Sequence, residues 1–486
     1  MKTKQKTCIQ SAFVTIASAL IGLVSASAQT TNWNGSGAWA SDSSWDNGVP
    51  DASSDAVINA IGTATLAIPG GSTWKTLTAT NSQANSTLTL QVTNSTSSSG
   101  GAMNVSSSNS GKITFNLPNL GSLTLSGPLN LTTSSSVADG VSLNIGAGNT
   151  LNVNGGISFG GNTSGLNNAT FFHGSITEAA PATINADLTF NNGSRFLGTA
   201  DAGNNSSLII NGSVTLQSGG FTGAAAYFNV GRANAGESGF TVKIRDNLSV
   251  SAGTAQVRKG RILEVGSATI SSSGALVLTG VANATSDAVF RSSGDLDING
   301  GTLNTNNATG TGGGYLLDIG GDFKLHTGST VALNSTVASG LTTMKLAGNF
   351  DISATSLSSG NLNELRLTLD GTAPQTLEAA VVSGNEIFRV AKLTLDTDFV
   401  SLVDNYVNVG DNEFFKTGDL VNIGETTLTL NGLQFFVGDM ELTAGTYTEF
   451  GGSLTVVAVP EPSAVLLLGG SLACLWLVRT RSQKRA

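Results

Sequence analysis

The chain has 486 residues, a formal net charge of −9, 11% charged residues and only two cysteines, Cys8 and Cys474. Both cysteines lie in apolar segments near the ends, so hydrogen bonding and apolar packing alone must hold the body together. Residues 29–459 carry sixteen basic and thirty-one acidic side chains, and this net charge of −15 argues against nucleic acid and anionic lipid as partners.

The first segment of the chain has the features of a secretory signal peptide. Three lysines, at positions 2, 4 and 6, precede an apolar run over 9–24, which ends at the small residues ASA (26–28). This order predicts cleavage before Gln29 and removal of residues 1–28. An uncleaved membrane anchor is the alternative, but the run is short for a membrane span.

Residues 29–74 are expected to form an N-terminal cap. The stretch TTNWNGSGAWASDSSWDNGVPDASSDAVIN (30–59) places Trp33, Trp39 and Trp45 six residues apart, and Trp74 follows. Such a cluster suits an apolar lid on the first coil of a repeat protein. A sugar-binding aromatic platform is the alternative.

The body repeats one short pattern, in which polar and apolar residues alternate after a turn residue. It occurs as GSLTL (121–125), NTLNV (149–153), ADLTF (186–190), GSVTL (212–216), DNLSV (246–250), GSATI (266–270), GDLDI (294–298), GDFKL (321–325) and GNFDI (348–352). Its copies are separated by 28, 37, 26, 34, 20, 28, 27 and 27 residues. Alternation predicts half-buried strands, and the recurring spacing indicates stacked coils.

The fold class that follows is all-β: a β-solenoid, expected as a right-handed parallel β-helix with almost no helix in the body. We assign 75–370 to the repeat body and 371–459 to a C-terminal β-helix segment and cap. About fourteen coils at the usual strand spacing give a rod roughly 65 Å long. A series of antiparallel β-sandwich modules is the alternative, and Asn-Gly pairs such as 154–155 fit turns in either fold.

The repeat also predicts which side chains point inward. Residues two apart on a strand share a face and should stack on their equivalents in adjacent coils. The inward positions of the last three repeats are Leu296, Ile298, Phe323, Leu325, Phe350 and Ile352, whereas Asp297 should face outward.

Several stretches resemble exported proteins with autotransporter-associated β-strand repeats. They are the Trp-rich opening and three later segments: APQTLEAA (373–380), VSLVDNY (400–406) and TTLTLNGLQFFVGDMELTAGTYT (426–448). A true autotransporter ends in a membrane barrel of amphipathic strands, which this chain lacks. The resemblance therefore implies a β-helical body without self-translocation.

The tail, residues 460–486, resembles the PEP-CTERM sorting signal of exosortase-processed proteins. Pro460, Glu461 and Pro462 come first, and a mostly apolar run over 463–478 follows. A basic cluster of Arg479, Arg481, Lys484 and Arg485 ends the chain. The sixteen residues of the run would span about 24 Å as a single transmembrane helix, short of a bilayer core of roughly 30 Å.

This resemblance implies a route and a partner. The basic cluster keeps the C-terminus in the cytoplasm, so the body faces the periplasm and residues 463–478 anchor it transiently in the inner membrane. An exosortase-type membrane protease then recognises the PEP motif and releases or transfers the body toward the cell surface or extracellular matrix. A permanent tail anchor is the alternative.

The body offers few candidates for catalysis. It contains two histidines, His173 and His326, and no motif of a metalloprotease or a serine hydrolase. Asp295 and Asp297 share one strand face, as do Asp396 and Asp398, and paired carboxylates can bind Ca²⁺ or act as acid and base. Leu296 and Ile298 take the inward face, however, so the first pair is expected to be solvated.

The basic stretch Arg258-Lys259-Gly260-Arg261 is likewise expected to be a solvated turn rather than an anion site. No catalytic residue, cofactor or metal ligand is therefore assigned. The sequence favours a non-enzymatic surface or extracellular-matrix protein associated with exopolysaccharide or the cell envelope. A β-helical lyase or glycosidase, or an adhesin, is the alternative.

Overall fold

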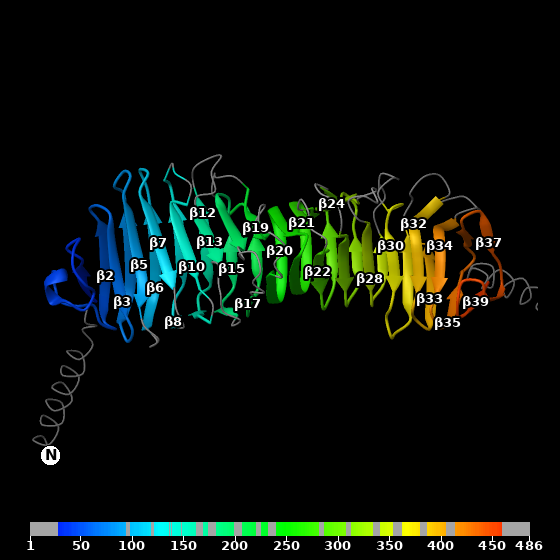
Figure 1. Cartoon of the computed structure of the whole chain (residues 1–486), viewed down its shortest axis with the longest axis horizontal. Helices are drawn as coiled ribbons and strands as arrows, with labels where there is room; N and C mark the ends of the chain where they lie inside the picture. The colour runs from blue at the N-terminus through cyan, green and yellow to red at the C-terminus, as the bar shows by residue number, and fades with distance from the viewer. Residues whose placement is uncertain are drawn as a thin grey trace, which may run out of the picture.

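The computed structural model describes residues 28–93, 98–117, 121–135, 137, 139–146, 148–161, 169–173, 181–198, 207–219, 225–231, 240–280, 286–307, 313–333, 341–352, 362–379, 386–404 and 414–458. In these ranges the chain forms strands and one short 3₁₀ helix, η1 (Asp42–Ser44). The strands wind into a parallel β-solenoid of about 12 turns, slightly fewer than the fourteen expected. Figure 1 shows them stacked side by side along the long axis of a rod.

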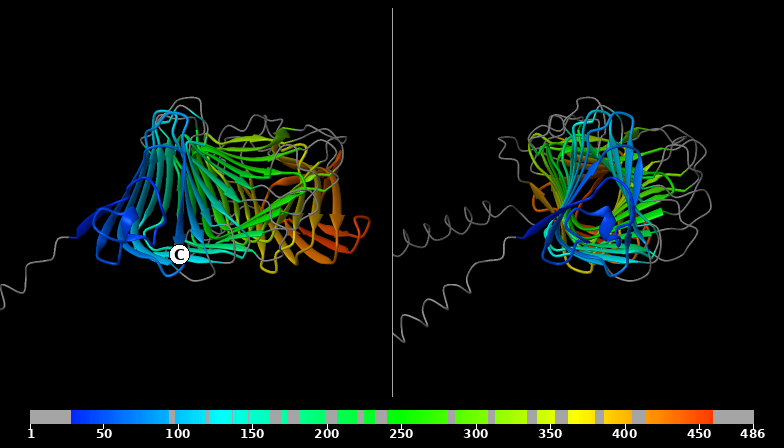
Figure 2. Two further views of the ribbon diagram at one scale, coloured as in Figure 1. Left: turned by 60° about the vertical axis from the view of Figure 1, so that its left-hand side comes forward. Right: turned by 90° about the vertical axis from the view of Figure 1, so that its left-hand side faces the viewer.

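Each complete coil contributes one strand to each of three faces. In one coil these strands are β10 (Val141–Ile145) on face 1, β11 (Thr150–Val153) on face 2 and β12 (Ile157–Gly161) on face 3. Each strand pairs in parallel with its equivalents one coil before and one coil after, and the coils enclose a common core (Figure 2). This parallel pairing overturns the alternative of antiparallel sandwich modules.

The strands group by face as follows. Face 1 contains β3 (Ala64–Pro69), β5 (Thr87–Thr93), β7 (Lys112–Leu117), β10, β13 (Ala169–His173), β16 (Ser194–Gly198), β19 (Tyr227–Val230), β24 (Thr302–Asn307) and β27 (Thr330–Ala332). Face 2 contains β8 (Ser122–Leu125), β11, β14 (Ala182–Asn185), β17 (Ser207–Ile210), β22 (Ala288–Ser292), β25 (Tyr315–Ile319), β28 (Thr342–Leu346) and β30 (Arg366–Leu369). Face 3 contains β1 (Gln29–Asn32), β2 (Ser54–Ala60), β9 (Leu129–Thr133), β12, β15 (Leu188–Phe190), β18 (Val214–Leu216), β23 (Leu296–Asn299), β26 (Phe323–Leu325), β29 (Phe350–Ile352), β31 (Gln375–Ala379), β33 (Phe399–Asp404), β35 (Glu425–Thr429) and β39 (Ser453–Val457).

Six longer strands run through a corner and supply more than one pairing: β4 (Thr73–Asn81), β6 (Ser98–Ser107), β20 (Phe240–Arg258), β21 (Arg261–Thr279), β32 (Glu386–Leu395) and β34 (Phe414–Asn422). β20 and β21 each span 19 residues, and Phe240 lies opposite Arg261. These two coils are therefore short, with no room for an outward loop between their strands.

The core consists of inward side chains stacked coil upon coil. Phe323 lies between Leu296 and Phe350, and Leu325 lies between Ile298 and Ile352. All six are at most 1% exposed, and the rings of Phe323 and Phe350 are 5.2 Å apart. The inward ladder expected from the alternating repeat is confirmed, because parallel pairing in register places each apolar residue on its equivalent.

Outward polar side chains also pair between coils. On face 2 the Asn185 side-chain amide donates to Oδ1 of Asn152, and the Asn211 amide donates to Oδ1 of Asn185 at 2.7 Å. Similar amide bonds join Asn130 to Asn104 and Asn144 to Asn116. Such ladders satisfy the polar groups of the surface in the repeat direction itself.

The two ends of the rod are closed in different ways. At the N-terminal end Trp39 packs edge-on against Trp45 and Trp74, with ring centroids 5.1 Å and 5.5 Å away. At the other end β36 (Gln434–Val437) pairs antiparallel with β37 (Met440–Leu442), and β38 (Gly445–Tyr447) pairs antiparallel with β39. A change to antiparallel hairpins stops the parallel stacking and blunts a strand edge.

Two expected segments lie outside the described residues: the signal peptide, apart from its last residue, and the whole tail from 460 to 486. Within the described ranges, no helix is long and apolar enough to cross a membrane.

Candidate functional site

The carboxylates Asp295 and Asp297 point outward from the corner before β23 and from β23 itself, and both have cationic neighbours. Lys324 Nζ lies 2.6 Å from Asp295 Oδ2, and His326 Nε2 lies 3.1 Å from Asp297 Oδ1. The two aspartates were expected to be solvated; their side chains are instead only 43% and 30% exposed, and they form ion pairs across the coil.

The proton affinity of Asp295 is unsuited to general-acid catalysis. Burial raises its pKa, but the hydrogen bond from Lys324, the N–H of Asp322 and the positive charge of Lys324 outweigh burial, so the pKa lies below the usual value. The hydrogen bond to Asp295 correspondingly raises the pKa of Lys324. A catalytic acid needs the opposite shift, so this carboxylate remains an ionised partner of Lys324.

The other sequence candidates are not brought together. Asp396 and Asp398 are exposed in the turn between β32 and β33. His173 ends β13, whereas His326 follows β26, and these strands belong to different coils. Among the residues that the structure describes, no three His, Cys, Asp or Glu side chains are grouped as a metal ion requires.

The expectation of a solvated turn at residues 258–261 is wrong. Lys259 and Arg261 are each only 2% exposed. Lys259 Nζ donates to the carbonyl oxygen of Gly313 at 3.2 Å and lies 5.0 Å from the ring centroid of Tyr315. Burial lowers the pKa of Lys259, and the charge of Asp287 opposes that shift. These cations are covered because the corner lies against neighbouring coils, which spacing in the sequence does not reveal.

The tryptophans do not form an open platform. Trp33, Trp39, Trp45 and Trp74 are between 1% and 5% exposed, and the indole N–H of Trp45 donates to the carbonyl oxygen of Trp39 at 2.8 Å. A sugar stacks on an exposed aromatic face. The buried rings offer no such face, so their geometry is that of an apolar lid.

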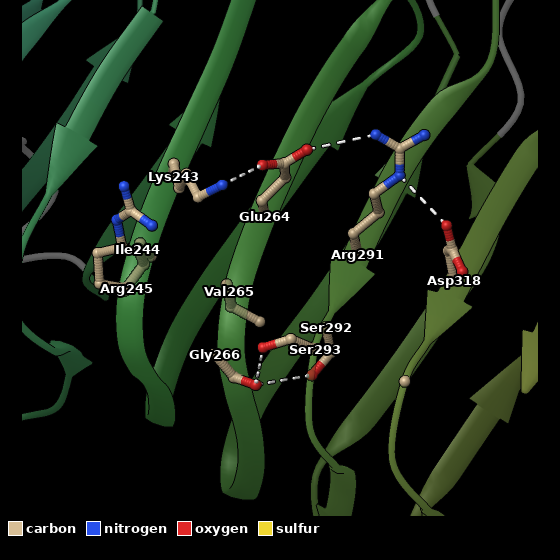
Figure 3. Close-up of a pocket in the computed structure, with 11 residues that line it drawn as sticks. Lys243, Ile244, Arg245, Glu264, Val265, Gly266, Arg291, Ser292, Ser293 and Asp318 are labelled. Carbon is tan, nitrogen blue, oxygen red and sulfur yellow. Dashed lines mark hydrogen bonds and ion pairs between the residues drawn. The ribbon is translucent and has the colours of Figure 1, made fainter. Parts of the chain in front are cut away.

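A shallow groove of about 410 Å³ crosses face 2 over β20, β21, β22 and β25 (Figure 3). We call it the face-2 groove; its lining residues are Lys243, Ile244, Arg245, Glu264, Val265, Gly266, Arg291, Ser292, Ser293, Asp318 and Gly320. One row of charges crosses it with alternating sign, because the register places Lys243, Glu264, Arg291 and Asp318 on successive strands.

The charges of this row are held by one another. Lys243 Nζ lies 3.2 Å from Glu264 Oε2, Arg291 Nη1 lies 3.3 Å from Glu264 Oε1, and Arg291 Nε lies 3.2 Å from Asp318 Oδ2. Their side chains are 27–44% exposed, so each pair adds little stability by itself. Both acids of the groove are therefore ion-paired, and neither is free to act as a base.

The face-2 groove was missed from the sequence, although a signal for it exists. Lys243, Glu264, Arg291 and Asp318 are separated by 21, 27 and 27 residues, which are coil lengths of this region. Adding one coil length to an outward charged position would have aligned the row. The residues Pro460, Glu461, Pro462, Arg479, Arg481, Lys484 and Arg485 lie outside the described residues.

Comparison of the chain with protein-family models, with curated proteins and with solved structures gave no match.

Proposed function

We propose that this is an exported, non-enzymatic protein of the cell surface or extracellular matrix, with a body that presents its outer faces to exopolysaccharide or the cell envelope. The observation that carries the proposal is the pairing of the outward carboxylates. Asp295, Asp297, Glu264 and Asp318 each have a cationic partner between 2.6 Å and 3.3 Å away. A surface whose charges neutralise one another between coils serves stacking and display rather than proton transfer.

The route to the surface follows from the two ends of the sequence. The signal peptide (1–28) directs export, residues 463–478 form a transient membrane helix, and the basic cluster stops transfer. An exosortase-type membrane protease acts at Pro460, Glu461 and Pro462. For the body we propose the right-handed form of the parallel β-helix, because crossovers between parallel strands take that hand almost without exception.

A β-helical lyase or glycosidase is the competing function, and turnover separates the two. Purified protein should be incubated with acidic and neutral polysaccharides while new reducing ends and unsaturated sugars are measured, with and without Ca²⁺. The proposal predicts no turnover. Turnover that disappears in the Asp295→Asn or Glu264→Gln variant would establish the enzyme instead.

A further inference from the structure

Arg245 is the one cation of the face-2 groove without an ion pair. It is exposed at the end of the first strand segment of β20, and within the described part of the chain its guanidinium has no acceptor or carboxylate in reach. Lys243 and Arg291, by contrast, are both held by Glu264. Figure 3 shows the Arg245 side chain beside Lys243 at the rim of the hollow. A guanidinium in this position can bind a carboxylate through two parallel hydrogen bonds.

The floor beside Arg245 is bare and polar. Gly266 and Gly320 contribute no side chain there, and the hydroxyl of Ser293 donates to the carbonyl oxygen of Gly266 at 3.1 Å. Glycine is required at position 266, because a Cβ atom would lie 2.5 Å from the carbonyl oxygen of Arg245. The open floor is thus a fixed property of the corner, and hydroxyl and carbonyl groups line it.

A row of amides leads along face 2 to Arg245. Ile210 lies opposite Ile244, so Asn211 and Arg245 are the next positions of the same register. Behind Asn211 the row continues through Asn185 to Asn152, one amide for each coil. Amide side chains offer both donors and acceptors to hydroxyl groups, and their repeat of about 4.8 Å approximates one sugar unit of an extended glycan.

We propose that face 2 binds a linear, carboxylate-bearing polysaccharide laid along the solenoid axis. Asn152, Asn185 and Asn211 contact its hydroxyls, and Arg245 holds a uronate carboxylate over the floor of the groove. The inference deepens the proposed function, on which it rests, by naming the class of glycan and the surface. The body carries a net charge of −15, so attraction of a polyanion is confined to a local basic site and is sensitive to salt.

The test is a binding titration of the full-length protein with polygalacturonate, measured by calorimetry at low and high salt. Fully methyl-esterified polygalacturonate has the same backbone without the charge, and poly-glutamate has the charge without the sugar. We expect polygalacturonate to bind, binding to weaken at high salt, and both comparison polymers to bind at least about tenfold more weakly.

The variant pair is Arg245→Ala and Arg366→Ala. Arg366 is also an exposed arginine on face 2, on β30, but it lies outside the groove. Arg245→Ala should weaken polygalacturonate binding by about tenfold or more, and Arg366→Ala should leave it within twofold. Unchanged circular dichroism and melting would show that both variants are folded.

Equal binding by wild type and Arg245→Ala would overturn the inference, as would equal binding of poly-glutamate or of the esterified polymer. Absence of polygalacturonate binding would overturn it too. The proposed function has separate readouts, since it fails only through catalytic turnover or through an unprocessed tail. A negative titration with a processed tail and no turnover therefore removes the inference alone.

Discussion

The backbone N–H of Asp322 donates to Oδ1 of Asp295, 27 residues earlier, at 2.9 Å. The relationship recurs along the rod: the N–H of Asn349 donates to Oδ1 of Asp322, and the N–H of Thr376 donates to Oδ1 of Asn349. Gly348, which precedes Asn349, leaves room for this contact, because a Cβ atom there would overlap the carbonyl oxygen of Gly321. The Gly-Asp/Asn pair of the repeat is thus the device that fastens each corner to the next coil.

This corner device predicts that Asp322→Ala lowers the free energy of unfolding by about 1 kcal/mol or more, since the N–H of Asn349 loses its acceptor. Asp322→Asn should cost less, because an amide oxygen can accept the same bond, as Asn349 does from Thr376. Urea denaturation of the two variants measures the difference. Equal losses in both would show that charge, rather than the corner hydrogen bond, is what matters at this position.

The stacked core predicts a large difference between the two faces of neighbouring strands. Phe323→Ala should cost about 3 kcal/mol or more, because it opens a cavity between Leu296 and Phe350. The outward change Asp297→Asn removes only a half-exposed pair with His326 and should cost less than about 1 kcal/mol. Denaturant titrations of both variants provide the check, and similar losses would refute the register.

Burial of Glu378 predicts a pH-dependent effect. Desolvation raises the pKa of Glu378 above its ordinary 4.5, and the nearby Asp351 raises it further. The folded state therefore binds this proton more tightly than the unfolded state, and the ionised group costs stability once the pH exceeds its folded pKa. Glu378→Gln should stabilise the protein at pH 7, and its advantage should fade as the pH falls through the folded pKa toward 4. Thermal melts across that range measure it; a constant advantage at every pH would contradict the assignment.

The tryptophan lid predicts a structural rather than a binding defect. Trp39 is 1% exposed and contacts Trp45 and Trp74, so Trp39→Ala should cost about 3 to 5 kcal/mol. Polygalacturonate binding by the fraction that remains folded should be unchanged. Melting and the binding titration test the two statements, and weaker binding at unchanged stability would restore the sugar platform.

Much of the fold was accessible from the sequence because the coil is written as a local pattern. The alternation in GDLDI (294–298) and GDFKL (321–325) identifies the inward positions, and their separation of 27 residues states the coil length. Parallel stacking follows, since equivalent apolar residues then coincide. The pattern does not show what an outward side chain meets, because its neighbours belong to other coils.

That limit explains the two main misses. Lys259 and Arg261 resemble a solvated turn in the sequence, yet Lys259 reaches the carbonyl oxygen of Gly313, more than fifty residues away. Likewise, Asp295 resembles an ordinary surface acid until Lys324 and the N–H of Asp322 are placed beside it. Burial of a charge depends on the coil packed against it, and local alternation contains no information on that contact.

The measurement that most directly tests the account is mass spectrometry of the C-terminal peptide from wild-type and Glu461→Ala cells in a host with the sorting protease. Glu461 is the only charged residue of the PEP motif, so its replacement leaves the apolar run and the basic cluster, and hence membrane insertion, intact. The account predicts that the wild-type surface form lacks residues 463–478 and that the variant keeps its whole tail in the membrane. An intact C-terminus at Ala486 in the wild-type surface fraction would contradict it.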